Sequence, residues 1–232
     1  MLKEIDAVIL CGGLGTRLKP VVSDRPKVLA KIGDIAFLDV LLSSLAKYEL
    51  KNIILCVGYL KEQIKAHFNS NYNIKFSEED EPLGTGGALK KAKPLIKSNP
   101  FIVLNGDSIC NINFREFFNF HINKKGILSM VLARSKAVQD FGNVMLDSSQ
   151  RITSFKEKVV CRNECLINAG IYIMKKEIFS YMPDEKHFSL EYDLFSGLIE
   201  GDCYGFITES ELIDIGTPER YEKAINLIGE FK

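Results

Sequence analysis

The sequence predicts an α/β fold in which a doubly wound, Rossmann-like mixed sheet carries a small antiparallel β addition. Two observations favour this fold. In the first half of the 232-residue chain, apolar runs of strand length alternate with segments of helical periodicity, an order typical of parallel sheets covered by helices. In the second half, short strand patterns follow one another with only polar turns between them.

The elements of the first half follow from their apolar patterns. Residues 5–10 form a continuous apolar run, which is typical of a strand buried on both faces. Residues 37–48 carry leucines at helical spacing and predict an amphipathic helix. The other elements expected in this half are strands at residues 52–57, 72–76 and 101–104, and helices at residues 60–68 and 86–96.

The second half begins with an expected helix at residues 114–121 and then changes to short strands. Ser189 is a suitable N-cap for a helix that runs to residue 199, and Pro218 opens a last helix that ends near residue 228. No linker, repeat or low-complexity segment interrupts the chain, so we expect one domain over residues 1–232. The expected strands span residues 128–134, 142–146, 151–155, 166–174, 204–208 and 212–215.

Composition argues against several classes of protein. Thirty basic residues balance thirty acidic ones, so no global field attracts nucleic acid or a membrane surface. The apolar runs are too short to span a bilayer, and the N-terminus carries acidic residues, unlike a signal peptide. The six cysteines form no C-x-x-C pair and are expected to be reduced thiols. We therefore expect a cytoplasmic protein without nucleic-acid or membrane partners.

A basic, glycine-rich loop, "LCGGLGTRLKPVVSDRPK" (residues 10–27), follows the first strand directly. Glycines at positions 12, 13 and 15 allow backbone N–H groups to approach an anion. The dinucleotide pattern G-x-G-x-x-G fails because Leu18 stands where the third glycine belongs, and no G-K-[ST] follows as in a P-loop. A tight strand exit would explain the glycines, but it would not explain Arg17 or Lys27.

The loop resembles the signature of the sugar-1-phosphate nucleotidyltransferases, G-G-x-G-T-R-L-x-P followed by P-K. Further family landmarks occur in family order: "EPLGTGGAL" (81–89), "NGD" (105–107), "FG" (141–142), "FKEK" (155–158), "NAG" (168–170) and "DIGTPE" (214–219). Together they cover nearly the whole chain. The resemblance implies the nucleotide-diphospho-sugar transferase fold, with about residues 1–108 binding the nucleotide and about residues 109–232 binding the sugar phosphate.

The family joins a sugar 1-phosphate to an NTP and releases pyrophosphate. The attacking phosphate oxygen is already ionised, so repulsion between anions is the main obstacle and no general base is needed. Arg17 and Lys27 are expected to be catalytic. Arg17 would donate two hydrogen bonds to phosphate oxygens, and Lys27 would supply a compact positive charge. Asp107 and Asp214 each end an apolar strand, and the resemblance makes them the ligands of Mg²⁺.

The resemblance also implies two sets of binding residues. Phe141 stands where many relatives have Tyr, so one hydroxyl is missing from the expected sugar pocket. The sugar 1-phosphate is expected to contact Gly142, Glu157, Lys158 and Asn168. The nucleotide is expected to contact Leu10, Gly12, Gly13, Gly15, Thr16, Glu79, Glu81, Pro82, Gly84 and Thr85.

Base and sugar are inferred from the same landmarks. "EPLGTGGAL" most resembles guanylyltransferases of mannose and heptose 1-phosphates, and Glu79 or Glu81 could accept from the N1–H and N2 amino group of guanine. The alternative is that residues 78–81 form a solvated acidic loop. The short chain favours D-glycero-D-manno-heptose 1-phosphate as the partner of GTP. Uridylyl-, cytidylyl- and mannose-1-phosphate guanylyltransferases remain alternatives.

Two more distant alternatives are a glycosyltransferase and a non-catalytic nucleotide-sugar binding protein. A glycosyltransferase of this topology would use a D-x-D metal motif, and Asn105 stands at its first position. A binding protein would not need Arg17, Lys27 and the two aspartates together. The sequence leaves open whether the chain forms a homo-oligomer.

Overall fold

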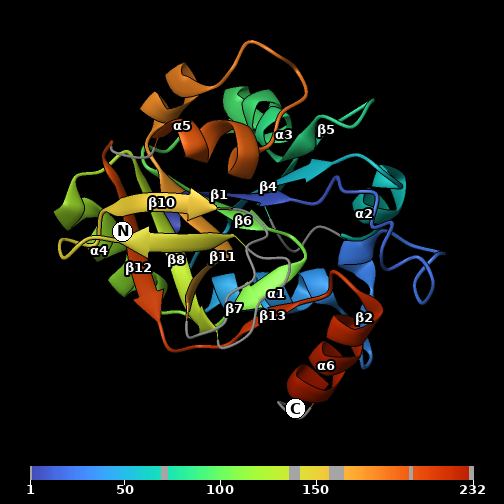
Figure 1. Ribbon diagram of the computed structural model, residues 1–232. Helices are drawn as coiled ribbons and strands as arrows, with labels where there is room; N and C mark the ends of the chain where they lie inside the picture. Colours follow the sequence, from blue (N-terminus) through green and yellow to red (C-terminus); the bar gives the residue numbers. More distant parts are fainter. Residues whose placement is uncertain (1, 69–72, 136–141, 157–164, 199–200, 230–232) are drawn as a thin grey trace.

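The computed structural model describes residues 2–68, 73–135, 142–156, 165–198 and 201–229 (Figure 1). The parallel part of its main sheet has the order β6 (Phe101–Asn105), β1 (Asp6–Leu10), β4 (Asn52–Val57) and β5 (Asn73–Glu78). Leu10 lies opposite both Cys56 and Asn105, so the carboxyl ends of neighbouring strands meet at one edge of the sheet. Ligands of open α/β sheets bind at this edge.

Helices cover both faces of the parallel strands, as the sequence predicts. Alternate strand residues enter different core clusters, with Ile9 on one face and Val8 on the other. The helices α1 (Phe37–Ala46), α2 (Lys61–His67) and α4 (Phe114–Lys124) contribute residues to the core cluster that contains Ile9. The helix α3 (Gly84–Ala92) packs with Val8 on the opposite face. The sheet is therefore doubly wound.

The antiparallel addition is built around β11 (Cys165–Met174), which pairs with β6 and extends the main sheet. The register between β11 and its neighbour β8 shifts between Asn168 and Tyr172, where Gly170 has a φ of +71°. The strands of this part are β8 (Leu128–Ser135), β9 (Asn143–Leu146), β10 (Ile152–Lys156) and β12 (Cys203–Thr208). All their pairs are antiparallel except β12 with β8, which is parallel.

The last segments of the chain return toward the first loop. The strand β13 (Leu212–Asp214) pairs with β7 (Ser108–Cys110), and the helix α6 (Pro218–Gly229) follows. Figure 1 shows α6 beside β2 (Lys31–Ile32). Leu18 of the glycine-rich loop is buried in a small core with Ile215 and Ala224. This core anchors the loop against α6 and β2.

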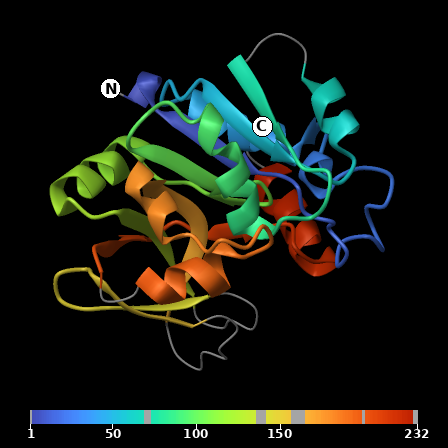
Figure 2. The same cartoon turned by 90° about the horizontal axis from the view of Figure 1, so that it is seen from above.

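A segment before β12 covers α3. It contains the 3₁₀-helix η4 (Lys176–Tyr181), the π-helical turn η5 (Leu190–Phe195) and α5 (Ser196–Leu198). Figures 1 and 2 both show this segment, in orange, beside α3 in green, and Gly86 N donates to Phe188 O across the contact. It therefore brings residues 186–192 to the edge where the parallel strands end.

Some elements differ from the sequence prediction. Ser189 is an N-cap as predicted, but the helix expected to run to residue 199 is the π-turn η5 followed by α5. The helix expected at residue 86 begins at Gly84, because the segment around Phe188 packs on its first turn. Short elements were missed because two to six residues show no periodicity: β2, β7, η4, β3 (Ile35–Ala36), η1 (Leu2–Glu4), η2 (Lys27–Leu29) and η3 (Lys93–Leu95).

Two further findings concern expectations drawn from composition. Within the described residues, no helix has both the length and the apolar character needed to cross a bilayer. Within the described residues, Cys11, Cys56, Cys110 and Cys203 are buried free thiols.

Candidate active site

Two cavities open side by side at the carboxyl edge of the parallel strands, and both are lined by Asn105 and Asp107. The first has a volume of about 290 Å³ and is lined mainly by the glycine-rich loop and by residues 79–88. The second has a volume of about 210 Å³ and is lined by residues from β11, η5, β13 and α6. Two ligands bound in these cavities would meet at the end of β6.

The glycine-rich loop presents its backbone to the first cavity. Gly12 and Gly13 line that cavity, and a Cβ at Gly13 would meet nothing within 4 Å. Within the described part of the chain, no protein group accepts a hydrogen bond from the N–H groups of residues 12–16. These successive free donors form a nest suited to an anion such as a triphosphate. Gly15 has a φ of +60° and lies against Lys27.

Lys27 and Asp107 form an ion pair where the two cavities join. The Lys27 side chain is 16% exposed and lines the first cavity. Burial alone would raise the pKa of Asp107, but the ammonium of Lys27, assisted by Arg17, holds the pKa of that carboxyl below its usual value. Asp107 is therefore an anion at neutral pH.

Asp214 joins Asp107 through the β7–β13 pair. Asp214 lies opposite Ser108 in the register, and Ile215 N donates to Asp107 O at 3.0 Å. Its Oδ1 accepts from Gly216 N at 2.9 Å and from Arg220 Nη1 at 3.4 Å. Burial raises the pKa of Asp214, and the carboxylate of Asp107 raises it further, while the two donors oppose this shift. The two carboxylates thus share one electrostatic environment.

Hard carboxylate oxygens of this kind suit Mg²⁺, which usually takes one or two carboxylates together with substrate phosphates. Among the described residues, no group of three or more His, Cys, Asp and Glu side chains could hold a metal without such help. Asp107 and Asp214 therefore fit a metal that binds with phosphate oxygens, as the resemblance implies.

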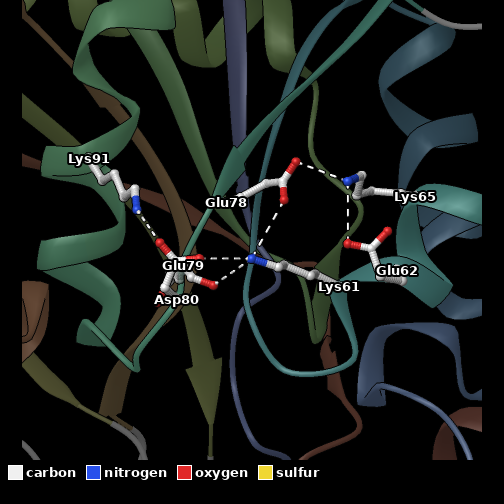
Figure 3. A network of polar contacts seen from close by, with 7 residues as sticks. All are labelled: Lys61, Glu62, Lys65, Glu78, Glu79, Asp80 and Lys91. Atoms are coloured by element: carbon white, nitrogen blue, oxygen red, sulfur yellow. Dashed lines mark hydrogen bonds and ion pairs between the residues drawn. The ribbon is translucent and has the colours of Figure 1, made fainter.

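The acidic run at residues 78–81 divides between solvent and the first cavity. Figure 3 shows Glu78 paired with Lys61 and Lys65, and Asp80 paired with Lys61 and Lys91, on the outer side of the run. Glu79 is only 6% exposed and lines the first cavity. Three of these acids do match the solvated-loop alternative, but Glu79 does not.

The carboxylate of Glu79 lies directly above Gly12. A Cβ at Gly12 would stand 2.5 Å from Glu79 Oε1, so a side chain at this position would displace the carboxylate from its present place. Glu79 Oε2 accepts from Leu83 N at 3.1 Å. Burial raises the pKa of Glu79, although the Leu83 N–H opposes the shift. One carboxylate oxygen is held by the backbone and the other faces the loop, which places a strong acceptor in the wall of the cavity.

Most residues that the sequence predicts for the nucleotide line the first cavity. They are Leu10, Gly12, Gly13, Glu79, Pro82, Gly84 and Thr85. Gly15 and Thr16 belong to the same loop but not to the cavity wall, and Glu81 lies on a separate surface groove with Asp80 and Lys91. The structure therefore separates the two glutamates that the sequence leaves as alternatives.

The residues predicted for the sugar phosphate are only partly described. Gly142 and Asn168 line the second cavity together with Arg17. The amide of Asn168 donates to Tyr172 Oη at 2.7 Å and accepts from Gly170 N at 3.0 Å, so it also shapes the irregular stretch of β11. The interpretations of Phe141, Glu157 and Lys158 lie outside the described residues.

The structure adds cavity residues to which the sequence analysis assigned no role. Asn105 belongs to a quoted landmark, and a Cβ at Gly170 would lie 2.8 Å from its Nδ2. Arg220 follows the "DIGTPE" landmark directly and reaches back to Asp214. Glu191 lies two residues after the Ser189 N-cap and lines the second cavity. Asn105 could be found within its landmark and Arg220 by extending a landmark by one residue, whereas Glu191 required the packing of η5 on α3.

Comparison with known proteins decides the family. The family model described as nucleotidyl transferase matches residues 6–230. The chain belongs to the nucleotidyl transferase family. Among curated members, the D-glycero-alpha-D-manno-heptose 1-phosphate guanylyltransferase of Aneurinibacillus thermoaerophilus is 39% identical over 224 residues, covering 95% of this chain and 96% of that protein. A protein with the same description from Campylobacter jejuni is 38% identical, covering 94% and 97%.

Solved structures of other proteins share the fold. HddC from Yersinia pseudotuberculosis, crystallised with GMP-PN, superposes with a TM-score of 0.84 at 35% identity, covering 98% of this chain and all of that one. A glucose-1-phosphate thymidylyltransferase structure from Bacillus anthracis, at 20% identity and a TM-score of 0.83, supports the fold alone. The sequence-based prediction of the nucleotide-diphospho-sugar transferase fold and of a sugar-1-phosphate nucleotidyltransferase is thereby confirmed.

Proposed function

We propose that this nucleotidyl transferase moves GMP from GTP to D-glycero-D-manno-heptose 1-phosphate, forming a GDP-heptose and pyrophosphate. The observation that carries the choice of GTP is the buried carboxylate of Glu79 above Gly12 in the first cavity. Guanine presents N1–H and an N2 amino group on one edge, and one carboxylate can accept from both. The heptose-specific descriptions of the relatives and the GMP-PN complex of HddC support the same choice.

The reaction proceeds by attack of a sugar-phosphate oxygen on the α-phosphorus of GTP. The P–O bond to the β-phosphate breaks, and pyrophosphate leaves with the bonding electron pair. The nucleophile carries no proton at neutral pH, so no residue has to act as a base. The task of the protein is to position two anions and to offset their repulsion.

We assign this task to the loop and its two cations. The free N–H groups of residues 12–14 hold the triphosphate, while Lys27 faces the first cavity and Arg17 lines the second. Both cations flank Asp107, where the two cavities join. As negative charge builds on the leaving pyrophosphate, these cations interact more strongly with it than with the ground state, which lowers the barrier.

We propose that Asp107 and Asp214 hold Mg²⁺ together with phosphate oxygens of the substrates. A bound Mg²⁺ supplies charge neutralisation at the reacting phosphates. Asp214 is oriented for this role because Gly216 and Arg220 both bind its Oδ1.

The biological setting follows from the proposed reaction. A GTP-dependent enzyme of this kind acts in the cytoplasm, and its product would supply glycosyltransferases that build surface glycans such as capsule or lipopolysaccharide. The division near residue 108, with the nucleotide before it and the sugar phosphate after it, is part of the same proposal.

The test is pyrophosphate release measured for four NTPs against heptose 1-phosphate and mannose 1-phosphate, with and without Mg²⁺. We expect the highest kcat/KM for GTP with the heptose, and no turnover in chelator. A preference for UTP or CTP would refute the assignment of Glu79 to guanine. A preference for mannose 1-phosphate would refute the heptose assignment and leave the guanosine assignment intact.

A further inference from the structure

The turn that carries Glu191 is fixed against the nucleotide side of the molecule. Gly86 N donates to Phe188 O at 3.0 Å, and Phe188 N donates to Leu83 O at 3.1 Å. A Cβ at Gly86 would stand 2.2 Å from the ring of Phe188, so the glycines of "GTGG" allow this close contact. Because the contact is made by backbone on both sides, the turn has little freedom to move relative to α3.

The Glu191 carboxylate is held by two hydroxyl groups. Its Oε2 accepts from Thr85 Oγ1 at 2.7 Å and from Ser189 Oγ at 2.8 Å. Thr85 in turn accepts from Leu190 N at 2.9 Å. Within the described part of the chain, Oε1 has no hydrogen-bond donor, and a carboxylate has lone pairs for about four bonds. Acceptor capacity therefore remains at a fixed position in the second cavity.

The second cavity has two chemically different parts, which come from different elements of the fold. Arg17, Arg220 and the two aspartates come from the glycine-rich loop, α6, the turn between β6 and β7, and β13, and they suit a phosphate with its metal. Glu191 comes from η5, beside the exposed ring of Tyr192, and a phosphate would be repelled by its charge. Neutral hydroxyl groups are the donors that match a fixed carboxylate next to an aromatic ring.

We propose that Glu191 accepts hydrogen bonds from hydroxyl groups of the sugar 1-phosphate and so determines which sugar the enzyme takes. This inference rests on the proposed function, since it places the sugar in the second cavity. Thr85 lines the first cavity and binds Glu191, so the acceptor is positioned by the segment that lines the nucleotide cavity.

The competing explanation is that Glu191 only stabilises the turn. The variant Glu191→Gln distinguishes this structural role from a role in sugar binding. The amide oxygen of glutamine can still accept from Thr85 and Ser189, which preserves the turn. The remaining oxygen becomes an NH₂ group, which cannot accept from a sugar hydroxyl. We expect the KM for the sugar 1-phosphate to rise roughly tenfold to a hundredfold while the KM for GTP changes less than about threefold.

Asp193→Asn is the matched control. Asp193 lies in the same turn and accepts from Ser189 N at 2.7 Å, but it does not line the second cavity. It should leave the KM values for both substrates unchanged. Glu191→Asp, which keeps the charge but draws the carboxylate back, is a second variant and should show the same selective loss of sugar binding, with folding of each variant checked by thermal melting.

The decisive measurement compares monodeoxy analogues of the sugar 1-phosphate that the wild type uses best. For the hydroxyl that Glu191 binds, wild-type kcat/KM should fall roughly tenfold or more on deoxygenation, and Glu191→Gln should show little further loss. Equal penalties in wild type and variant at every position, or an unchanged sugar KM in Glu191→Gln, would overturn the proposal. Failure of the wild type to use a heptose would refute the proposed substrate alone, because the comparison is made on whichever sugar is turned over.

Discussion

The two cavities are built in different ways. The first is made largely by two short stretches of chain, residues 10–14 and 79–88, and much of its wall is backbone exposed by glycine. The second is made by side chains from the loop, β6, β11, η5, β13 and α6, which lie far apart in the sequence. A triphosphate can be held by N–H groups that any sequence carries, whereas a particular sugar needs particular side chains.

Different parts of the chain can therefore change with different consequences. The first cavity depends on the absence of side chains at Gly12 and Gly13, so most substitutions there obstruct the nest. The second depends on which side chains are present, so single substitutions can alter the sugar without disturbing the fold. Asp107 lines both cavities, so a substitution there should impair the reaction with every substrate pair and should not change the choice of sugar.

The largest effect is expected for Asp107→Asn. The change removes a charge that binds Lys27 and that we assign to Mg²⁺, and it does so at the junction of the two cavities. We expect kcat for pyrophosphate release to fall by about 10³-fold or more, with any sugar as partner. The same change at Asp147, an acid in the turn that joins β9 to β10, is the control and should be silent. Retention of more than a tenth of the activity in Asp107→Asn would show that this carboxylate does not serve both cavities.

The next largest effects are expected for Arg17→Ala and Lys27→Ala. Each removes a cation that we place beside the reacting phosphates, and the loss should appear in kcat more than in the KM for GTP. Removal of one such contact typically costs ~10²–10³-fold in rate. Lys19→Ala removes an exposed cation of the same loop that contacts the ring of Tyr59 and lines neither cavity, so it should have little effect. A rise in KM alone would reclassify either residue as a ground-state binder.

The sequence predicts the first cavity better than the second because its signals are local. A buried strand followed by glycines at fixed spacing identifies the loop, and Glu79 is identified by its place before "EPLGTGGAL". Sequence alone could not separate Glu79 from Glu81. That distinction depends on how the chain turns after β5 ends at Glu78: Glu79 is buried in the wall of the first cavity, whereas Glu81 is exposed on a separate surface groove.

The second cavity was harder to predict because contacts between distant segments create it. The positive φ of Gly170 and the register shift in β11 make room for Asn105, and neither is visible in the local pattern. Glu191 enters the cavity because the predicted regular helix is replaced by a π-turn that packs on α3. Neither contact follows from propensity, since each depends on a partner about 65 to 105 residues away.

Nucleotide discrimination should respond to Glu79→Gln and not to Glu81→Gln. The glutamine can keep the bond from Leu83 N but can no longer accept both donors of guanine. A polar edge left unpaired costs about 1–3 kcal/mol, so the preference for GTP over UTP and CTP should fall roughly ten- to a hundredfold. The assay is kcat/KM for each NTP, with the sugar held constant. Equal loss in both variants would mean that the acidic run acts only through its overall charge.

The smallest expected effect concerns thermal stability. The pKa shifts of the neighbouring residues Glu78 and Glu79 have opposite signs, so their ionised forms should affect stability in opposite directions. Burial raises the pKa of Glu79 above that of the unfolded chain, so its ionised form costs stability at neutral pH, and this cost disappears as the pH falls below about 4.3. Glu79→Gln should therefore raise the Tm at pH 7 by roughly 2–4 °C, equivalent to a gain on the order of 1 kcal/mol, and the gain should vanish in acid.

Lys65, reinforced by Lys61, lowers the pKa of Glu78, so its ionised form contributes stability that is present at neutral pH and lost in acid. Glu78→Gln should accordingly show no gain at pH 7. Thermal melts of both variants from pH 4 to pH 8 measure this difference, and a Tm increase in Glu79→Gln that persists at pH 4 would show that burial of the charge is not its cause.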